Sequence, residues 1–256
     1  MYELPDLPKN ISCDHPALQL RGEGYCTFLR GKVLLLIVRI SDGVAAWDDG
    51  AKKRFDAYVE DCAGWMSSTS AAYPRPVQIS RRYHDIRLSR AYRFDNEAQR
   101  DSILEMMGNS TSASKLQIIF RKRYKVDSVA LVFAFNYDIR GHAYPGVRGD
   151  FGSGMNEIAY VSATDIDRPV LAHEVFHQYG AVDYYYPKRY EAACLKHFGG
   201  SIMNDTVKKV DPLTAYLIGW TDSLSPEAVA FLEETADVTE AEIDAGRYTL
   251  QAAGNE

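Results

Sequence analysis

The sequence predicts an α+β fold, with a mixed α/β sheet in an N-terminal subdomain and a mostly helical C-terminal subdomain. Up to about residue 180, apolar runs typical of buried strands alternate with amphipathic helical patterns. After Asp183, short helical segments separated by loops replace that alternation. The length of 256 residues, 46% of them hydrophobic, is enough to bury a sizeable core. We expect a lead-in at 1–31 and one domain at 32–256, divided into subdomains 32–180 and 181–256.

The first elements read as a strand, a long helix and an extended segment. KVLLLIVRI (32–40) is much shorter than the ~20 apolar residues that span a bilayer, so it indicates a buried strand. Apolar residues from Trp47 to Trp65 recur at helical spacing and predict one amphipathic helix over 45–66. VQISRRYHDIRLS (77–89) alternates imperfectly and reads as extended.

Two further helices and three strands follow in the same half of the chain. A helix is expected from about residue 95 to Met107, where Gly108 stops it. The remaining elements are a helix in SASKLQIIFRKRYKV (112–126), a buried strand in SVALVFAFN (128–136), a short exposed strand in GHAYPGV (141–147) and a strand in NEIAYVSA (156–163). Strands separated by helices predict a mixed α/β sheet.

Composition and charge exclude some functions and partners. The net charge of −6 argues against a nucleic-acid-binding protein, and the basic run RKRYK (121–125) is interpreted as a solvated helix face. No apolar run is long enough for a membrane span. The opening MYELPDLPKN has neither the basic start nor the apolar stretch of a signal peptide, which predicts a cytoplasmic protein if Met1 is the native start.

The four cysteines form no CxxC pair and are too widely spread for a zinc ribbon. Cys62 lies on the apolar stripe of the long helix and is expected in the core. Cys13 and Cys26 could close a loop by a disulfide if the protein is exported.

The segment AHEVFHQYGAVD (172–183) carries the strongest chemical signal in the chain. Residues four apart share one face of a helix, so His173 and His177 can present two imidazole nitrogens to one metal ion. Glu174 lies one residue round the helix. It cannot join the pair, but it can reach a metal-bound water and serve as general base.

The third ligand accounts for the break in this helix. Asp183 is ten residues past His173, and a continuing helix would carry it ~15 Å along the axis, too far to share a metal. Gly180 can adopt the left-handed conformation that ends a helix and turns the chain back. His173, His177 and Asp183 then predict a site for one Zn²⁺ per chain with an open fourth position, as in catalytic zinc sites.

HEVFHQYGAVD resembles the extended HExxHxxGxxH motif of the metzincin zinc proteases, in the version with aspartate as third ligand found in snapalysin-like and immune-inhibitor-A-like enzymes. Metzincins also have a methionine-bearing turn some distance after the third ligand. SIMND (201–205) places Met203 twenty residues after Asp183, which is similar. The resemblance implies a metzincin-like zincin fold and a secreted zinc-dependent endopeptidase that acts on a peptide or protein substrate.

The resemblance also implies a substrate-binding edge strand and, in several families, a tyrosine that stabilises the oxyanion. GHAYPGV is similar to that edge strand, which makes Gly141, His142, Ala143 and Tyr144 the candidate substrate-binding residues. The tyrosine follows the turn methionine by two residues in those families, but Asp205 occupies that position here. The candidates to replace it are Tyr184, Tyr185 and Tyr216.

Other interpretations of the motif remain open. The two histidines could be core residues satisfied by hydrogen bonds. A gluzincin-type protease would instead use Glu191 as third ligand. A non-catalytic zinc-binding protein would close the site with a fourth ligand such as His197 or Cys194, and Cys13 could cap the metal and keep an enzyme latent.

Overall fold

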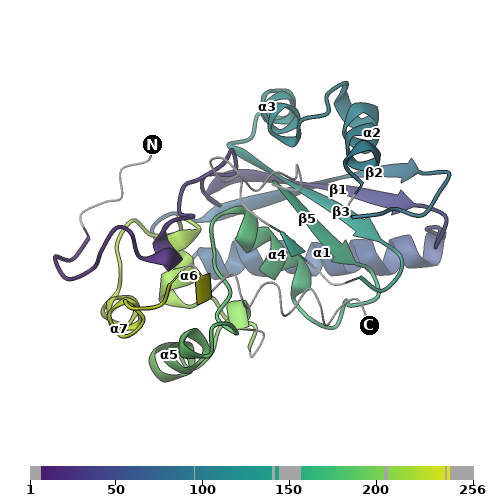
Figure 1. The fold of residues 1–256 in the computed structure, drawn as a ribbon. Coiled ribbons are helices and arrows are strands. Elements are labelled where there is room, and N and C mark those ends of the chain that lie inside the picture. Colours follow the sequence, from purple (N-terminus) through teal and green to yellow (C-terminus); the bar gives the residue numbers. More distant parts are fainter. Residues whose placement is uncertain are drawn as a thin grey trace.

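The computed structural model describes residues 7–94, 96–139, 142–143, 157–204, 207–239 and 241–242. Its centre is a five-stranded sheet of strand order β2-β1-β3-β5-β4 (Figure 1). The strands are β1 (Gly31–Ser41), β2 (Val77–Arg87), β3 (Ser128–Phe135), β4 (His142–Ala143) and β5 (Ile158–Ser162). The first four in spatial order are parallel, whereas β4 pairs antiparallel with β5 at one edge. The predicted mixed α/β architecture is therefore confirmed.

The central strands β1 and β3 are buried on both faces. Because a parallel sheet covered by helices has no solvent face, these strands read as continuous apolar runs without alternation. Successive β1 side chains pack alternately into two separate hydrophobic cores. Val33 and Leu35 belong to one core, and Leu34 and Leu36 belong to the other. The run that looked uniform in the sequence thus fills two layers.

Helices cover both faces of the sheet, which gives three layers (Figure 1). Above the sheet in this view lie α2 (Glu97–Gly108) and α3 (Ala113–Tyr124); below it lie α1 (Asp49–Ser70) and α4 (Val170–Gln178). The long helix α1 begins four residues later than expected, because the Asp48 side chain caps it by accepting the N–H of Ala51 at 2.7 Å. It also continues past residue 66, since its buried face extends to Ser70.

The chain after Asp183 is mostly helical, as expected. It contains α5 (Lys188–Phe198), the 3-10 helix η2 (Ile202–Asn204), α6 (Pro212–Leu217) and α7 (Pro226–Glu234). Aromatic side chains join these segments: the ring of Phe231 packs against Tyr184, Tyr190 and Phe198, with centroids 5.2–5.4 Å apart. None of the helices in the described ranges is both long enough and apolar enough to cross a membrane.

The lead-in is part of this core rather than a loose appendage. Ala17 and Leu18, in the short 3-10 helix η1 (Pro16–Leu18), are buried in the same cluster as α1, α4 and the C-terminal helices. All four cysteines are free thiols, and Cys26 is buried with its thiol donating to the carbonyl of Val129 at 3.1 Å. The conditional disulfide between Cys13 and Cys26 does not form.

Candidate metal centre

Helix α4 presents His173 and His177 on one face and then ends. The N–H of Gly180 donates to the carbonyl of His177, and the N–H of Ala181 donates to the carbonyl of Phe176, so the chain turns back within one residue of the helix end. Gly180 has φ +91°, in the left-handed region. The backbone at Gly180 therefore adopts the predicted left-handed conformation, and helix α4 ends just before it.

Gly180 is also required by its surroundings. A Cβ at this position would lie 2.4 Å from the carbonyl oxygen of Leu20, so the lead-in packs directly on the turn. Any larger residue would have to push Leu20 away or change the turn. The turn that brings Asp183 back toward α4 is therefore fixed by both backbone conformation and packing.

Three ligand atoms from this segment converge on one point. The Nε2 atoms of His173 and His177 are 3.0 Å apart. Asp183 Oδ1 lies 3.2 Å from Nε2 of His173 and 3.1 Å from Nε2 of His177. These three residues form a group that could hold a metal ion.

The hydrogen bonds of the two rings decide what the converging atoms are. His173 Nδ1 lies 2.9 Å from the carbonyl oxygen of Ile202, and His177 Nδ1 lies 2.9 Å from that of Ala181. A carbonyl oxygen only accepts, so both Nδ1 atoms carry the proton. In the neutral imidazoles both Nε2 atoms then bear lone pairs, aimed at each other and at a carboxylate oxygen.

A divalent cation fits this arrangement. Ligand atoms on a tetrahedral zinc with bonds of ~2.0–2.1 Å lie about 3.3–3.4 Å apart, close to the separations of 3.0–3.2 Å between the three atoms here. Asp183 Oδ1 is buried and faces the two Nε2 atoms. When these nitrogens carry lone pairs, Oδ1 has no hydrogen-bond donor, so a cation would satisfy all three atoms. The donor set of two imidazoles and one carboxylate is typical of zinc.

The electrostatics of the group indicate the same need for positive charge. Burial alone would lower the pKa of both histidines, but the hydrogen bonds that Asp183 accepts from the rings and the charges of Asp183 and Glu174 raise both pKa values instead. Burial would raise the pKa of Asp183, but the facing histidines lower it. The group thus favours positive charge beside its nitrogens, which a proton or a metal ion could supply.

Glu174 and Tyr185 flank the three ligand atoms. Glu174 is buried, with 4% of its surface exposed, and its charge acts on both histidines. The Tyr185 hydroxyl donates to Asp183 Oδ2 at 2.7 Å, and its ring stacks on that of His173 with centroids 6.4 Å apart. Asp183 is thus held by Tyr185 through one oxygen and faces the histidines with the other.

The turn around Met203 adjoins the same group. Met203 is fully buried in η2, and its carbonyl accepts the N–H of Tyr184 at 2.8 Å. The neighbouring carbonyl of Ile202 is the partner of His173. Asp205, two residues after the methionine, lies outside the described residues.

The three candidate tyrosines have different partners in the structure. The hydroxyl of Tyr184 is directed to Thr214 at 3.2 Å and Asp211 at 3.4 Å, away from the ligand atoms. The ring of Tyr216 lies under the guanidinium of Arg21, 4.1 Å from its centroid. The Tyr185 hydroxyl, by contrast, donates to Asp183, a residue of the metal group.

The alternative ligands lie elsewhere. Glu191 pairs with Lys188 at 2.7 Å on α5, and His197 lies 2.6 Å from Glu234. In the part of the chain that the structure describes, the metal group contains neither of them, nor Cys194, nor the exposed Cys13. Nothing therefore favours the interpretations that depended on these ligands.

The expected edge strand is present in part. His142 and Ala143 pair with Tyr160 and Ala159 as the antiparallel edge β4, which lies next to α4. Gly141, Tyr144 and the rest of GHAYPGV lie outside the described residues. Next to the helix that carries the histidines, the sheet therefore has an edge strand.

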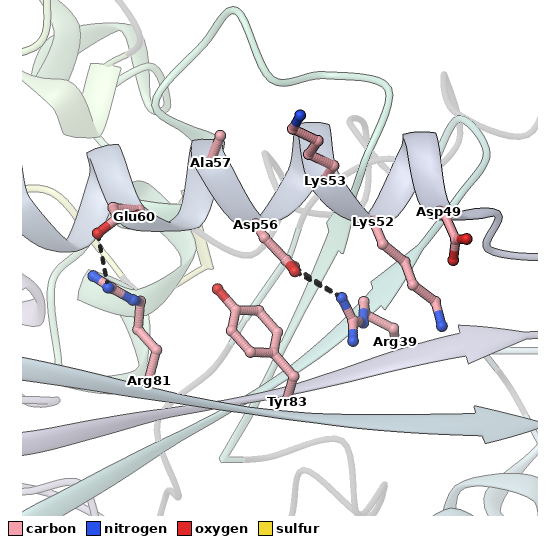
Figure 2. A pocket seen from close by; sticks show the side chains of 9 residues that line it. All are labelled: Arg39, Asp49, Lys52, Lys53, Asp56, Ala57, Glu60, Arg81 and Tyr83. Carbon is pink, nitrogen blue, oxygen red and sulfur yellow. Dashed lines mark hydrogen bonds and ion pairs between the residues drawn. The ribbon is translucent and has the colours of Figure 1, made fainter.

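A cavity of about 600 Å³ lies away from the metal group, between α1 and the strands β1 and β2 (Figure 2). Charged side chains from both elements line it, and ion pairs join them across it. Figure 2 shows Arg39 reaching Asp56 and Arg81 reaching Glu60, with Tyr83 between. No group that could bind a metal is found here among the described residues.

Sequence reasoning did not identify the groups that orient the ligands. The carbonyls of Ile202 and Ala181 are backbone atoms, which no residue pattern reveals. Asp211, which binds the Met203 turn through Ser201, was also missed. The pair Asp211-Pro212 is a helix-start signal that could have marked this residue as a cap, but not its partners.

Fold and site together define the class: a mixed α/β protein with a parallel four-stranded core and a His-His-Asp group that could hold a metal ion. No protein-family model matches the chain, and no curated protein matches it. Among solved structures it resembles one titled "Structure of a chaperone-substrate complex", at 13% identity and a TM-score of 0.37. That match covers 81% of this chain and 34% of the other, so this chain spans about a third of its length. A likeness this distant carries no conclusion about function.

Proposed function

We propose that the protein is a zinc-dependent endopeptidase of the metzincin-like type, with His173, His177 and Asp183 as ligands of one Zn²⁺. The observation that carries the proposal is the convergence of two imidazole lone pairs and a carboxylate oxygen, at 3.0–3.2 Å from one another. A further carboxylate, Glu174, lies on the same helix turn. The antiparallel edge strand β4 supports the proposal, since the sequence resemblance implies an edge strand that binds substrate.

When bound, zinc would supply a water of lowered pKa and polarise the carbonyl of the scissile peptide bond. Glu174 is assigned as general base: it takes a proton from the attacking water and later delivers it to the leaving amine. Tyr185 fixes the orientation of Asp183 and is the candidate to stabilise the oxyanion.

The substrate would be a peptide in extended conformation. The edge strand β4 lies beside α4 and can receive a peptide backbone as an additional strand. Gly141, His142, Ala143 and Tyr144 are therefore proposed as the substrate-binding strand. Met203 is assigned to the turn that supports the ligands.

A non-catalytic zinc-binding protein is the alternative from another class. Glu174 argues against it, because a buried carboxylate that does not bind the metal is costly and a structural site has no use for a base. A structural zinc is also normally closed by four protein ligands, whereas the group found among the described residues has three.

The substitution Glu174→Gln tests the proposal. Glutamine keeps the size of the side chain but cannot take a proton, so peptide hydrolysis should fall by roughly 100-fold or more. Zinc content and melting temperature should barely change. Glu191→Gln is the matched control, because Glu191 is a partly exposed glutamate on α5 paired only with Lys188 in the recorded contacts. Activity is measured on a peptide library, since a narrow specificity would escape a single protein substrate.

Two results would contradict the proposal. If the parent protein binds zinc fully and cleaves no library peptide, the endopeptidase function is wrong and the metal site remains. If Glu191→Gln abolishes cleavage and zinc binding while Glu174→Gln keeps both, the gluzincin-type arrangement is favoured instead.

A further inference from the structure

Asp211 is a fully buried carboxylate that no part of the proposed reaction uses. Five donors converge on its two oxygens. Oδ1 accepts the backbone N–H groups of Leu213 at 3.0 Å and Thr214 at 2.9 Å, and the hydroxyl of Tyr184 at 3.4 Å. Oδ2 accepts the hydroxyls of Ser201 at 2.5 Å and Thr214 at 2.6 Å. Such a density of donors exceeds what an ordinary helix cap requires.

The two oxygens have different tasks. Oδ1 caps α6, because Leu213 and Thr214 supply two of the N–H groups that have no partner within the helix. Oδ2 makes no contact with a backbone N–H and binds hydroxyls only, one of them on Ser201 ten residues earlier. The cap and the link to Ser201 can therefore be separated by chemistry.

Ser201 transmits this link to the turn that carries Met203. Its hydroxyl oxygen accepts the N–H of Met203 at 3.0 Å while it donates to Asp211. Its own N–H donates to the side-chain oxygen of Asn204 at 2.9 Å. The turn at 201–204 is thus closed on itself and tied to α6 through one carboxylate oxygen.

Two carbonyls of this turn hold the metal group. The carbonyl of Ile202 accepts from His173 Nδ1, which fixes the ring orientation and leaves the lone pair on Nε2. The carbonyl of Met203 accepts the N–H of Tyr184, the residue directly after Asp183. A displacement of the turn would move both a histidine and the carboxylate.

We propose that Asp211 is a positioning residue for the metal centre: through Ser201 it holds the turn whose carbonyls orient His173 and anchor the backbone at Tyr184. This inference rests on the metal site of the proposed function, but not on peptide hydrolysis. Asp211 touches neither the metal ligands nor a substrate, so its effect appears in metal affinity and ligand geometry.

The decisive variant is Asp211→Asn. Asparagine is as good a helix cap as aspartate, so its carbonyl can still serve α6. Its amide nitrogen replaces Oδ2 and cannot accept the hydroxyls of Ser201 and Thr214. Ser201→Ala breaks the same link from the other side and leaves the cap untouched. Asp48→Asn is the matched control, because Asp48 caps α1 through Ala51 and has no recorded contact with the turn.

Zinc affinity is measured by competition with a chelator, and the absorption spectrum of the Co²⁺-substituted protein reports ligand geometry. We expect affinity to fall about 10-fold or more in Asp211→Asn and Ser201→Ala, as for other groups that orient metal ligands. The Co²⁺ spectrum should change in both and stay the same in Asp48→Asn. Melting curves of the metal-free proteins show whether a loss of stability alone accounts for the effect.

The outcomes separate this inference from the proposed function. If the parent binds zinc and both turn variants bind it equally tightly with the parent spectrum, the positioning role of Asp211 is wrong. If Asp211→Asn does not fold, Ser201→Ala decides by the same criterion. A parent that binds no zinc overturns the metal site and this inference together. A parent that binds zinc but cleaves no peptide overturns the protease alone, and the affinities of the variants still decide the role of Asp211.

Discussion

Two regions of the molecule gather charged side chains on the same side of the sheet, and they differ in how those charges are balanced. Between α1 and the strands β1 and β2, the buried Arg39 donates to Asp56 at 2.9 Å and to Asp85 at 2.7 Å. Lys52 also reaches Asp85, at 2.8 Å. Arg81 reaches Glu60, at 3.0 Å (Figure 2). Three cations thus meet three anions in ion pairs.

The metal group has the opposite character. His173, His177 and Asp183 direct two lone pairs and a carboxylate oxygen at one point, and all three side chains are largely buried. Acceptors that face one another repel unless a proton or a metal ion lies between them. The difference teaches that a dense cluster of charge does not itself indicate a binding site. What indicates one is a cluster whose own donors and acceptors do not match.

The largest effect that tests this contrast is on metal affinity. The parent should bind about one zinc per chain, and Asp183→Ala should weaken binding by well over 10-fold because it removes a ligand rather than a group that orients one. Asp85→Ala, in the balanced cluster, should leave zinc affinity unchanged. Both are followed by metal analysis and chelator competition. Full zinc occupancy in Asp183→Ala would exclude Asp183 as a ligand.

A smaller effect is expected from breaking the balanced cluster. Arg39→Met fills a similar volume but removes the cation paired with Asp56 and one of the two cations paired with Asp85, which keeps Lys52. Because both aspartates are more than a third exposed, water compensates part of the loss, and we expect unfolding to become easier by about 1–3 kcal/mol. Denaturant titration measures this, and zinc affinity should stay unchanged. A variant as stable as the parent would show that the cluster is energetically neutral.

The smallest effect concerns pH and salt. Burial tends to raise the pKa of Asp85, but the hydrogen bonds from Lys52 and Arg39 outweigh it and lower that pKa. Because the pKa of Asp85 is lower in the folded state, its charge stabilises the fold at pH values above the ordinary carboxyl pKa of about 3.9. This stabilisation is lost as the pH falls through the pKa of the folded state. Asp85→Asn should therefore cost a few tenths to about 1 kcal/mol at pH 7 and less at pH 3, where part of the carboxylate's contribution is already lost.

The cost of Asp85→Asn should also shrink at high salt, because screening weakens partly exposed ion pairs. Chemical unfolding of parent and variant at pH 7 and pH 3, each at low and high salt, gives the comparison. An equal cost in all four conditions would mean that Asp85 acts through packing rather than through its charge.

Local patterns in the sequence were sufficient for much of the fold and for the core of the metal group. Apolar runs marked β1, β3 and β5, and helical spacing marked α1, because side-chain periodicity follows directly from backbone geometry. The pair His173 and His177 needed only one helical turn to meet. Gly180 gave a local reason for the turn that returns Asp183. The division into subdomains and the role of Glu174 remain predictions.

Other features depended on hydrogen bonds and packing, some between neighbouring residues and some between distant parts of the chain. Helix α1 begins at Asp49 because Asp48 caps it, a choice that the apolar periodicity did not reveal. The sequence could not choose between Tyr184, Tyr185 and Tyr216, because all three have the same side chain. Their different partners in the folded protein distinguish them.

By itself, the sequence determined which residues could bind a metal, since ligand type and helical spacing are local properties. Only the tertiary structure decided that His173 and His177 present lone pairs there, because their tautomers depend on the carbonyls of Ile202 and Ala181. Backbone carbonyls are common to every residue, and the one that meets His173 comes from a turn that Asp211 holds in place. The orientation of the histidine rings therefore depends on tertiary packing and cannot be read from the pattern of residues.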